Sequence, residues 1–301
     1  MSLKMRIYYN AVCGALGGMV AWALSGLFSP ASTASFVLVL VRDALLGAIA
    51  GICIGGVLGA IDGVQARNRR QAMRGLVFGG VLGLIGGLIG LVAGELIFSV
   101  AGGGVWPRAT GWAIFGALIG ASEGLATRAP GKLVYGAVGG VIGGLIGGST
   151  YERITDVLRL VSHDRNLSVT VGGASGLVLL GACLGAMIAL TLVIGRDAWL
   201  RILGGRLEGR EVLISKRRMT IGASDGCDVY LPGDPAIAAQ HAVLDRTHTG
   251  YLLSIMPGTA PITVNQQRVA SGARIPLLGG EHLRFGTTAL LFYHSGAEEE
   301  A

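Results

Sequence analysis

Few residues of this chain have the type and spacing that chemistry requires. The stretch DVYLPGDPAIAAQHAVL (228–244) holds one histidine, His241, and the sequence around it supplies no metal-ligand cluster. The four cysteines form no CxxC pair, so the common zinc and redox motifs are missing. There is also no glycine-rich phosphate loop and no serine–histidine–aspartate arrangement with supporting context. We therefore predict that the chain is not an enzyme and holds no metal or cofactor.

Four carboxylates form a second group of candidates, because they lie in or beside long apolar stretches. They are Asp62, Glu95, Glu123 and Glu152. An acid inside a membrane usually serves an ion or proton pathway, whereas an acid at a helix end is solvated at little cost. The spacing places the four near helix ends, since Glu95 lies 20 residues, or about 30 Å of helix, after Gly75. Both interpretations stay open.

The first two thirds of the chain have the composition of a membrane domain. Of the 52 glycines among the 301 residues, 39 precede Arg196, where their neighbours are Leu, Ile, Val and Ala. About 20 apolar residues cross about 30 Å of hydrocarbon as a helix. The run 34–41 either lengthens the second span across Arg42 and Asp43 or lies in the interface. Such runs predict a Gly-rich domain at 1–195 with about six transmembrane helices, at 8–28, 44–61, 75–100, 110–126, 133–150 and 169–195.

The distribution of charge predicts the orientation of these helices. Residues 1–195 carry 13 Lys or Arg and 7 Asp or Glu, a net charge of +6, whereas residues 196–301 carry 11 of each. The short basic loops at 67–74 and 128–132 belong to the same side, which should be cytoplasmic together with both termini. The positive charge thus belongs to membrane loops and gives no sign of nucleic-acid binding.

A helical hairpin at 54–90 is repeated at 115–147, and both copies have the same orientation. Its glycines recur at every fourth residue and form a strip on one helix face, where two backbones can approach closely. The strip predicts either packing within one bundle, or a pore or a homo-oligomer contact. The repeat also aligns Asp62 with Glu123 and Glu95 with Glu152. The matching segments are IGGVLGAIDGV and FGALIGASEGL, at an offset of 61, and LVFGGVLGLIGGLIG and LVYGAVGGVIGGLIG, at an offset of 57.

After residue 195 the pattern changes to short alternating runs such as WLRIL, REVLIS, GYLLSI and ALLFYH. Turn residues separate them, as in an antiparallel sandwich. We predict an all-β sandwich at 198–294, followed by a solvated acidic tail at 295–301. The basic turn at 216–218 is either solvated or in contact with anionic lipid headgroups.

The motifs of this second part resemble those of forkhead-associated (FHA) domains. MTIGASDGCDVYLPGDPAIAAQHAVL (219–244) is similar to the family's strand ending in Gly-Arg, polar loop, Asp-Ile/Val-x-Leu and Ser-x-x-His-Ala. GYLLSIMPGTAPITVNQQRV (250–269) resembles its central strand, Gly-Thr turn and Val-Asn-Gly. IPLLGGEHLRFGTTALLFYH (275–294) resembles its Leu-x-x-Gly-Asp-x-Ile-x-Ile-Gly ending. The resemblance covers about a third of the chain and implies a sandwich that binds phosphothreonine peptides through loops at one end.

The resemblance also implies which residues would contact a peptide. His241 matches the family's histidine, which chiefly braces the loops, and buried polar groups are usually hydrogen-bonded within the fold. Asn265 matches the asparagine that contacts the peptide backbone, and Gln266 replaces the glycine that follows it. Ser224 is the one hydroxyl near the start of the first loop.

Two departures concern the phosphate itself. Ala223 stands where the family has the arginine that holds the phosphate region, and Ala238 stands where it has the serine that donates to phosphate. A phosphate carries close to two negative charges and is best held by charge-assisted donors, above all a bidentate arginine. Phosphothreonine recognition is therefore in doubt at this site.

Two functions follow from these patterns. The first is a membrane-anchored adaptor in the cell or inner membrane that presents a cytoplasmic FHA-like domain to a protein partner. By analogy with the family's pairing with Ser/Thr kinases, that partner would be a phosphoprotein in a bacterial signalling pathway. The alternative is a subunit of a channel or transporter that the FHA-like domain regulates, with the four carboxylates around one water-filled cavity.

Overall fold

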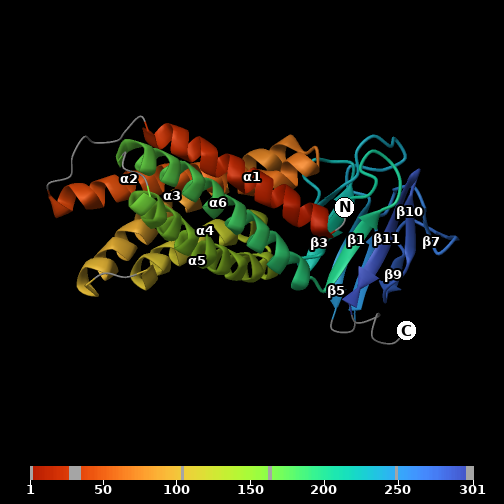
Figure 1. Cartoon of the computed structure of the whole chain (residues 1–301). Helices are drawn as coiled ribbons and strands as arrows, with labels where there is room; N and C mark the ends of the chain where they lie inside the picture. Colours follow the sequence, from red (N-terminus) through yellow and green to blue (C-terminus); the bar gives the residue numbers. More distant parts are fainter. Residues whose placement is uncertain (1–2, 27–34, 103–104, 162–164, 248–249, 296–301) are drawn as a thin grey trace. The chain divides into compact units, whose positions relative to one another are not determined.

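The protein divides into two compact units, a helical one and a β-sandwich (Figure 1). The predicted acidic tail lies outside the described residues, apart from Ser295. The structure is a computed structural model that describes residues 3–26, 35–102, 105–161, 165–247 and 250–295.

The helical unit consists, in its described part, of six α-helices. Each predicted span falls on one of them, although several helices extend beyond the apolar runs. The helices are α1 (Leu3–Ser25), α2 (Phe36–Gln65), α3 (Arg69–Val100), α4 (Val105–Thr127), α5 (Pro130–Val161) and α6 (Arg165–Ile194).

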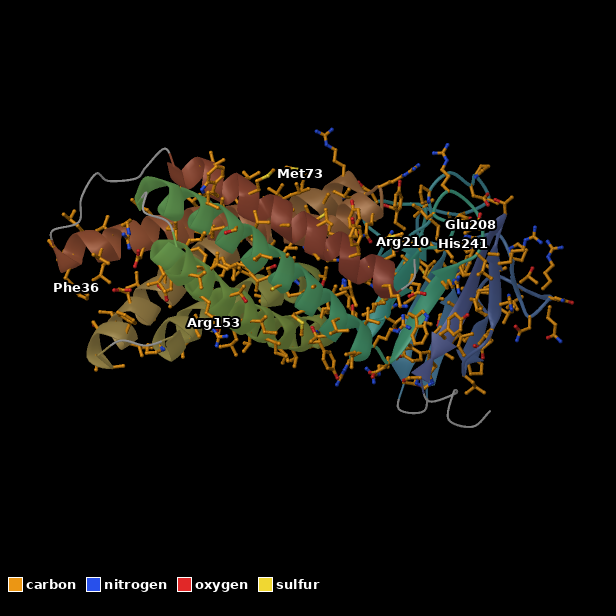
Figure 2. All side chains as sticks on the ribbon, viewed as in Figure 1. Phe36, Met73, Arg153, Glu208, Arg210 and His241 are labelled. Carbon is orange, nitrogen blue, oxygen red and sulfur yellow. The ribbon has the colours of Figure 1, made fainter. Side chains whose placement is uncertain are left out.

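Helix α2 begins earlier than the predicted span at 44–61. It starts at Phe36, which Figure 2 labels, and runs without a break through Arg42 and Asp43. The guanidinium of Arg42 and the carboxylate of Asp43 form an ion pair at 2.9 Å, so the helix carries no net charge at this level. The apolar run before Arg42 therefore lengthens the second helix.

Helix α3 buries its small residues and exposes many of its large apolar ones. The buried positions of α3 are seven glycines and Glu95, while Val77 and Ile89 on its other side are 52% and 53% exposed. Water would make this arrangement unfavourable, but lipid tails are as apolar as the exposed side chains. The pattern thus supports a bilayer as the solvent of this unit.

Five of the described helices are long and apolar enough to cross a membrane. Helix α4 is not among them, so the count of six spans stays a prediction. The five candidate spans are Lys4–Ser25, Phe36–Gln65, Arg69–Val100, Pro130–Leu158 and Val171–Ile194.

Glycines hold the two helices of each hairpin together. Gly79 of α3 faces Gly55 of α2, and Gly140 of α5 faces Gly116 of α4. A Cβ atom on any of these glycines would overlap a backbone carbonyl of the helix opposite. The strip therefore packs each hairpin internally in the structure.

These contacts also correct the register of the repeat. Both members of each pair, Gly55 with Gly79 and Gly116 with Gly140, are related by 61 residues. The predicted offset of 57 for the second helix is therefore wrong by one helical turn. Sequences with a glycine at every fourth position match almost equally well at either offset. With the corrected register, Glu95 corresponds to Asp156 rather than to Glu152.

A third pair has the same character, because Gly14 of α1 faces Gly181 of α6. The pairs close into a ring through contacts between α3 and α4, α5 and α6, and α1 and α2. These contacts are Gly90 with Gly111, Gly143 with Leu184, and Gly17 with Ile54. The centre of the ring is filled by apolar side chains, among them Ile54, Phe115, Leu180 and Leu184, all with no solvent exposure.

The second unit is a sandwich of two sheets. One sheet has the order β2-β1-β11-β10-β7-β8 and the other β4-β3-β5-β6-β9. The strands are β1 (Ala198–Ile202), β2 (Glu211–Leu213), β3 (Arg218–Gly222), β4 (Val229–Tyr230), β5 (Ala242–Thr247), β6 (Gly250–Ile255), β7 (Ile262–Val264), β8 (Gln267–Val269), β9 (Arg274–Leu277), β10 (His282–Phe285) and β11 (Thr288–His294).

The core of the sandwich lies between the two sheets. Leu200, Phe285 and Phe292 from the first sheet meet Ile221 and Leu253 from the second, and all five are completely buried. The other face of each strand points outward, as its alternating sequence predicts. The strands are antiparallel except for β3 and β4, which run parallel.

Candidate functional site

The end of β3 and the β4–β5 connection form the floor of the candidate site. The N–H of Ala223 donates to the carbonyl of Ala238 at 3.0 Å, and the N–H of Ser224 donates to the carbonyl of Ala239 at 3.1 Å. Gly222 makes this close approach possible, since a Cβ there would overlap the Ala239 carbonyl. The two positions that lack the family's arginine and serine are therefore direct neighbours, and together they present two methyl groups.

His241 is completely buried beneath these loops, at the end of the sandwich that also carries the labelled Glu208 and Arg210 (Figure 2). Its Nδ1 accepts the N–H of Ala238 at 3.1 Å, so Nε2 carries the proton and donates to the carbonyl of Ala260 at 2.8 Å. The ring edge packs against Phe285 at a centroid distance of 5.3 Å. Both imidazole nitrogens are thus used in joining two loops, and neither is free for a ligand.

Ser224 and Cys227 complete the first loop. The Oγ of Ser224 accepts the N–H of Gly226 at 3.3 Å, which leaves the hydroxyl hydrogen as a donor. The thiol of Cys227 donates to the carbonyl of Ala239 at 3.1 Å. Burial raises the pKa of this thiol, so it stays protonated and acts as part of the loop scaffold.

Asn265 and Gln266 form the two-residue turn between β7 and β8. The carboxamide oxygen of Asn265 accepts the N–H of His282 at 2.9 Å, and its own N–H donates to the His282 carbonyl. No described contact connects this turn with Ser224 or His241. The structure thus brings Ala223, Ser224, Ala238 and His241 together, whereas Asn265 and Gln266 belong to the other sheet.

Replacing Gln266 with glycine should stabilise the sandwich. The φ angles of Asn265 and Gln266 are 48° and 69°, as in a type I′ turn, where the second position favours glycine. A left-handed conformation costs a non-glycine residue about 1–2 kcal/mol, and the greater freedom of glycine in the unfolded chain offsets part of that gain. We expect a net gain of about 0.5–1 kcal/mol in urea unfolding of residues 195–301. An unchanged or lower midpoint would show that Gln266 is not strained.

Asp234 is a structural residue that the sequence motifs did not reveal. Its Oδ2 accepts the N–H and the hydroxyl of Thr287, at 2.6 and 2.7 Å, and its Oδ1 accepts the N–H of Ala236 at 2.9 Å. Gly286 leaves room for this carboxylate, which a Cβ there would overlap. The Asp-Pro-Ala sequence is the only local signal, since Asp often starts such a turn. The carboxylate joins the β4–β5 connection to the β10–β11 turn.

This clamp predicts an acid dependence of stability. The hydrogen bonds from Thr287 lower the pKa of Asp234 below its ordinary value. The stabilisation is then fully present above the unfolded-state pKa, about 3.9, and is lost as the pH falls through the folded-state value. We expect Asp234→Ala to be less stable than wild type at neutral pH and the difference to shrink below about pH 4 in urea titrations. A difference that does not change with pH would contradict this role.

The cations near the site differ in whether a carboxylate is paired with them. Lys216 is paired with Asp228, and Arg218 lies 3.6 Å from Asp245, so two of the three charges in the predicted basic turn are in ion pairs. Arg206, on the β1–β2 connection, packs over the β4–β5 connection, because a Cβ at Gly233 would lie 2.7 Å from its Nε. Arg206 is exposed, so it supplies a cation at the same end of the sandwich as the candidate site.

The predicted membrane carboxylates do not share one cavity. Asp62 is 3.0 Å from Lys132 Nζ and 3.6 Å from Arg6 Nη2, which ties α2 to α5 and α1. Glu95 is buried near the other end of the hairpin, about 23 helical residues or roughly 35 Å away along the axis. Glu123 and Glu152 lie on α4 and α5, and their side chains are outside the described ones. Among the described residues, no three His, Cys, Asp or Glu side chains form a metal-ligand group.

Comparison with families of known proteins found a match for the sandwich only. Residues 201–296 match the family described as the inner membrane component of the type III secretion system (T3SS), cytoplasmic domain. No curated protein matches the chain. The match leaves the helical unit without a family.

Solved structures, among them FHA domains, are similar over about a third of this chain. An FHA domain from Chlamydia trachomatis is 20% identical, with 32% of this chain and 95% of that chain covered and a TM-score of 0.29. The N-terminal FHA domain of Rad53p from S. cerevisiae, solved with a phosphothreonine peptide, is 18% identical, with 35% and 98% covered and a TM-score of 0.30. The cytoplasmic domain of the T3SS sorting platform protein PscD from P. aeruginosa is 24% identical, with 33% and 81% covered and a TM-score of 0.29. The C-terminal sandwich carries FHA-like motifs, and its residues 201–296 are similar to the cytoplasmic domain of a T3SS inner membrane component.

Proposed function

We propose that this protein is a membrane-anchored adaptor whose FHA-like sandwich faces the cytoplasm and binds a protein partner without requiring a phosphate. The match of residues 201–296 to a membrane component's cytoplasmic domain supports the anchoring and the side of the membrane. The apolar helices with their buried glycines support insertion into a bilayer. The short basic loops support cytoplasmic termini.

The hydrogen bond between the backbones of Ala223 and Ala238 is the observation that supports binding without a phosphate, because it makes these two alanines direct neighbours. Backbone hydrogen bonds join the two loops at these positions. The two side chains, however, are methyl groups, which donate no hydrogen bond to a phosphate. His241 cannot replace the missing donors, because both its nitrogens are bonded inside the fold. Ser224 supplies one neutral hydroxyl, which is a weak substitute for a guanidinium.

The described helices do not favour a channel or transporter. The centre of the helix ring is filled by Ile54, Phe115 and Leu180, and Asp62 and Glu95 lie at opposite ends of their hairpin. Asp62 is neutralised by Lys132 and so does not face open water as a lone charge.

The test is binding of the full chain, in lipid nanodiscs, to matched libraries of phosphothreonine and unmodified threonine peptides. We expect peptides to bind with the same affinity in both forms. A phosphothreonine preference of tenfold or more, about 1.4 kcal/mol, would overturn phosphate independence. Failure of every peptide to bind in either form would argue against an adaptor that reads short segments.

A gain-of-function variant provides a second test of whether the missing arginine and serine explain phosphate-independent binding. Ala223→Arg combined with Ala238→Ser restores the two donors on a floor that is already held in place by His241. We expect this variant to prefer phosphothreonine peptides, because the charge-assisted donors return to neighbouring positions. The matched control is Ala236→Ser, which adds a hydroxyl on the same connection outside the floor. An equal gain in both variants would show that the effect is not specific to the site.

A further inference from the structure

The outer face of the larger sheet carries a cluster of arginines. The strand register places Arg284 of β10 opposite Thr263 of β7, and Thr263 opposite Arg268 of β8. Arg201 of β1 lies opposite Leu291 of β11, which lies opposite His282 of β10. Arg284 is two strands, about 10 Å, from Arg268, and two strands and two residues from Arg201, so it lies between two arginines that are themselves four strands, about 19 Å, apart.

Among the described residues, no carboxylate pairs with these arginines, unlike Arg196, Lys216, Arg218 and Arg246 elsewhere in the sandwich. All three are exposed, and within the described residues none has a carboxylate oxygen within 4.0 Å. Arg284 donates from Nε to the carbonyl of Gly286, and its terminal nitrogens have no partner among the described residues. The nearest acid in the register, Glu211 beside Arg201, is held by Arg196 at 2.9 Å. The face therefore carries a net positive charge, since its neighbouring acid, Glu211, is already paired with Arg196.

Apolar side chains lie among the charges. Leu291 is half-buried next to Arg201, and Leu203 is 36% exposed where its N–H donates to Ala289 in the neighbouring strand. An apolar centre with a cationic, arginine-rich rim is typical of protein interfaces. A cluster that binds anionic lipid usually has four to eight Lys or Arg, whereas the described part of this face has three that are not held in an ion pair, because Arg196, which lies over Trp199, is paired with Glu211.

We propose that the outer face of this sheet, around Arg201, Arg268 and Arg284, docks an acidic segment of the partner protein through carboxylate–guanidinium pairs. The planar guanidinium can bind a carboxylate with two parallel hydrogen bonds, and this geometry favours arginine over lysine. The inference rests on the adaptor function proposed above and moves the contact from the loops to the face of the sheet.

The experiment uses the full chain in nanodiscs and a fluorescein-labelled peptide in which glutamate alternates with leucine. We expect the peptide to bind, and a matched peptide with glutamine in place of glutamate to bind weakly or not at all. Each of Arg201→Gln, Arg268→Gln and Arg284→Gln should weaken binding about two- to fivefold, with the losses combining in the triple variant. The melting temperature should not fall, since removing like charges relieves repulsion.

The matched control is Arg274→Gln, which removes an exposed arginine from the outer face of the other sheet. Loss of binding in Arg274→Gln equal to that in the three variants would overturn the proposed face. Binding that persists in the triple variant would overturn it too but leave the adaptor function standing, whereas no binding of any peptide would contradict both. If phosphatidylserine in the nanodiscs abolished the peptide binding that the wild-type chain shows in nanodiscs of neutral lipid, the face would be a lipid contact instead.

Discussion

Replacing His241 with alanine will lower the free energy of unfolding of the sandwich by about 3–5 kcal/mol. The ring is completely buried, and its loss leaves a cavity against Phe285. It also leaves the N–H of Ala238 and the carbonyl of Ala260 without their partners. Each unsatisfied buried group costs about 1–3 kcal/mol, and small domains have about 5–15 kcal/mol in total.

Urea unfolding of residues 195–301 measures this effect, with the fluorescence of Trp199 as the signal. The matched control is His282→Ala, because the His282 side chain is exposed and the described contacts of that residue use its backbone. We expect the control to change stability by about 0.5 kcal/mol or less. A loss below about 1 kcal/mol in His241→Ala would show that the loops hold each other without the ring.

Replacing Gly79 with alanine will destabilise the helical unit by about 2–3 kcal/mol, although alanine is the better helix former. The added methyl group would overlap the carbonyl of Gly55, and the atom in its way is backbone that cannot rotate aside. The helices must therefore separate along the glycine strip, which removes dispersion contacts from the whole interface.

Gly80→Ala is the matched control, one residue further along the same helix. A Cβ at Gly80 meets its nearest neighbour, the carbonyl of Ile52, at 3.8 Å, an ordinary contact. We expect this variant to be neutral or to gain up to about 1 kcal/mol. Unfolding in mixed micelles with increasing dodecyl sulfate compares the two. Equal stability of both variants would contradict the glycine-packed hairpin.

The FHA resemblance was recognisable from the sequence because its motifs are local and occur in order. Alternating apolar residues predict the strands, and the residues around His241 predict the loop that contains it. The Asp234–Thr287 clamp was not predicted, because its two partners are 53 residues apart and the motifs that contain them do not indicate which of their residues meet. The arginine cluster was not predicted either, since its members come from three strands that only sheet register brings together.

For the membrane repeat, the sequence predicted that a repeat exists but not the register in which its two copies align. The repeat could be recognised, because glycine at every fourth position is a strong pattern. Its register could not be predicted, because the same periodicity lets the two copies align equally well after a shift of one helical turn. The carbonyl contacts between Gly55 and Gly79 and between Gly116 and Gly140 remove that ambiguity, since only one register lets both backbones meet.

The sequence by itself determined the apolar helices, the strands of the sandwich and the loss of the family's arginine and serine, because each depends on residue type at short range. Tertiary structure decided how the glycines pair, that Asp62 is neutralised by Lys132, and that both nitrogens of His241 are used within the fold. Those outcomes depend on contacts between residues far apart in the chain, which local periodicity does not specify.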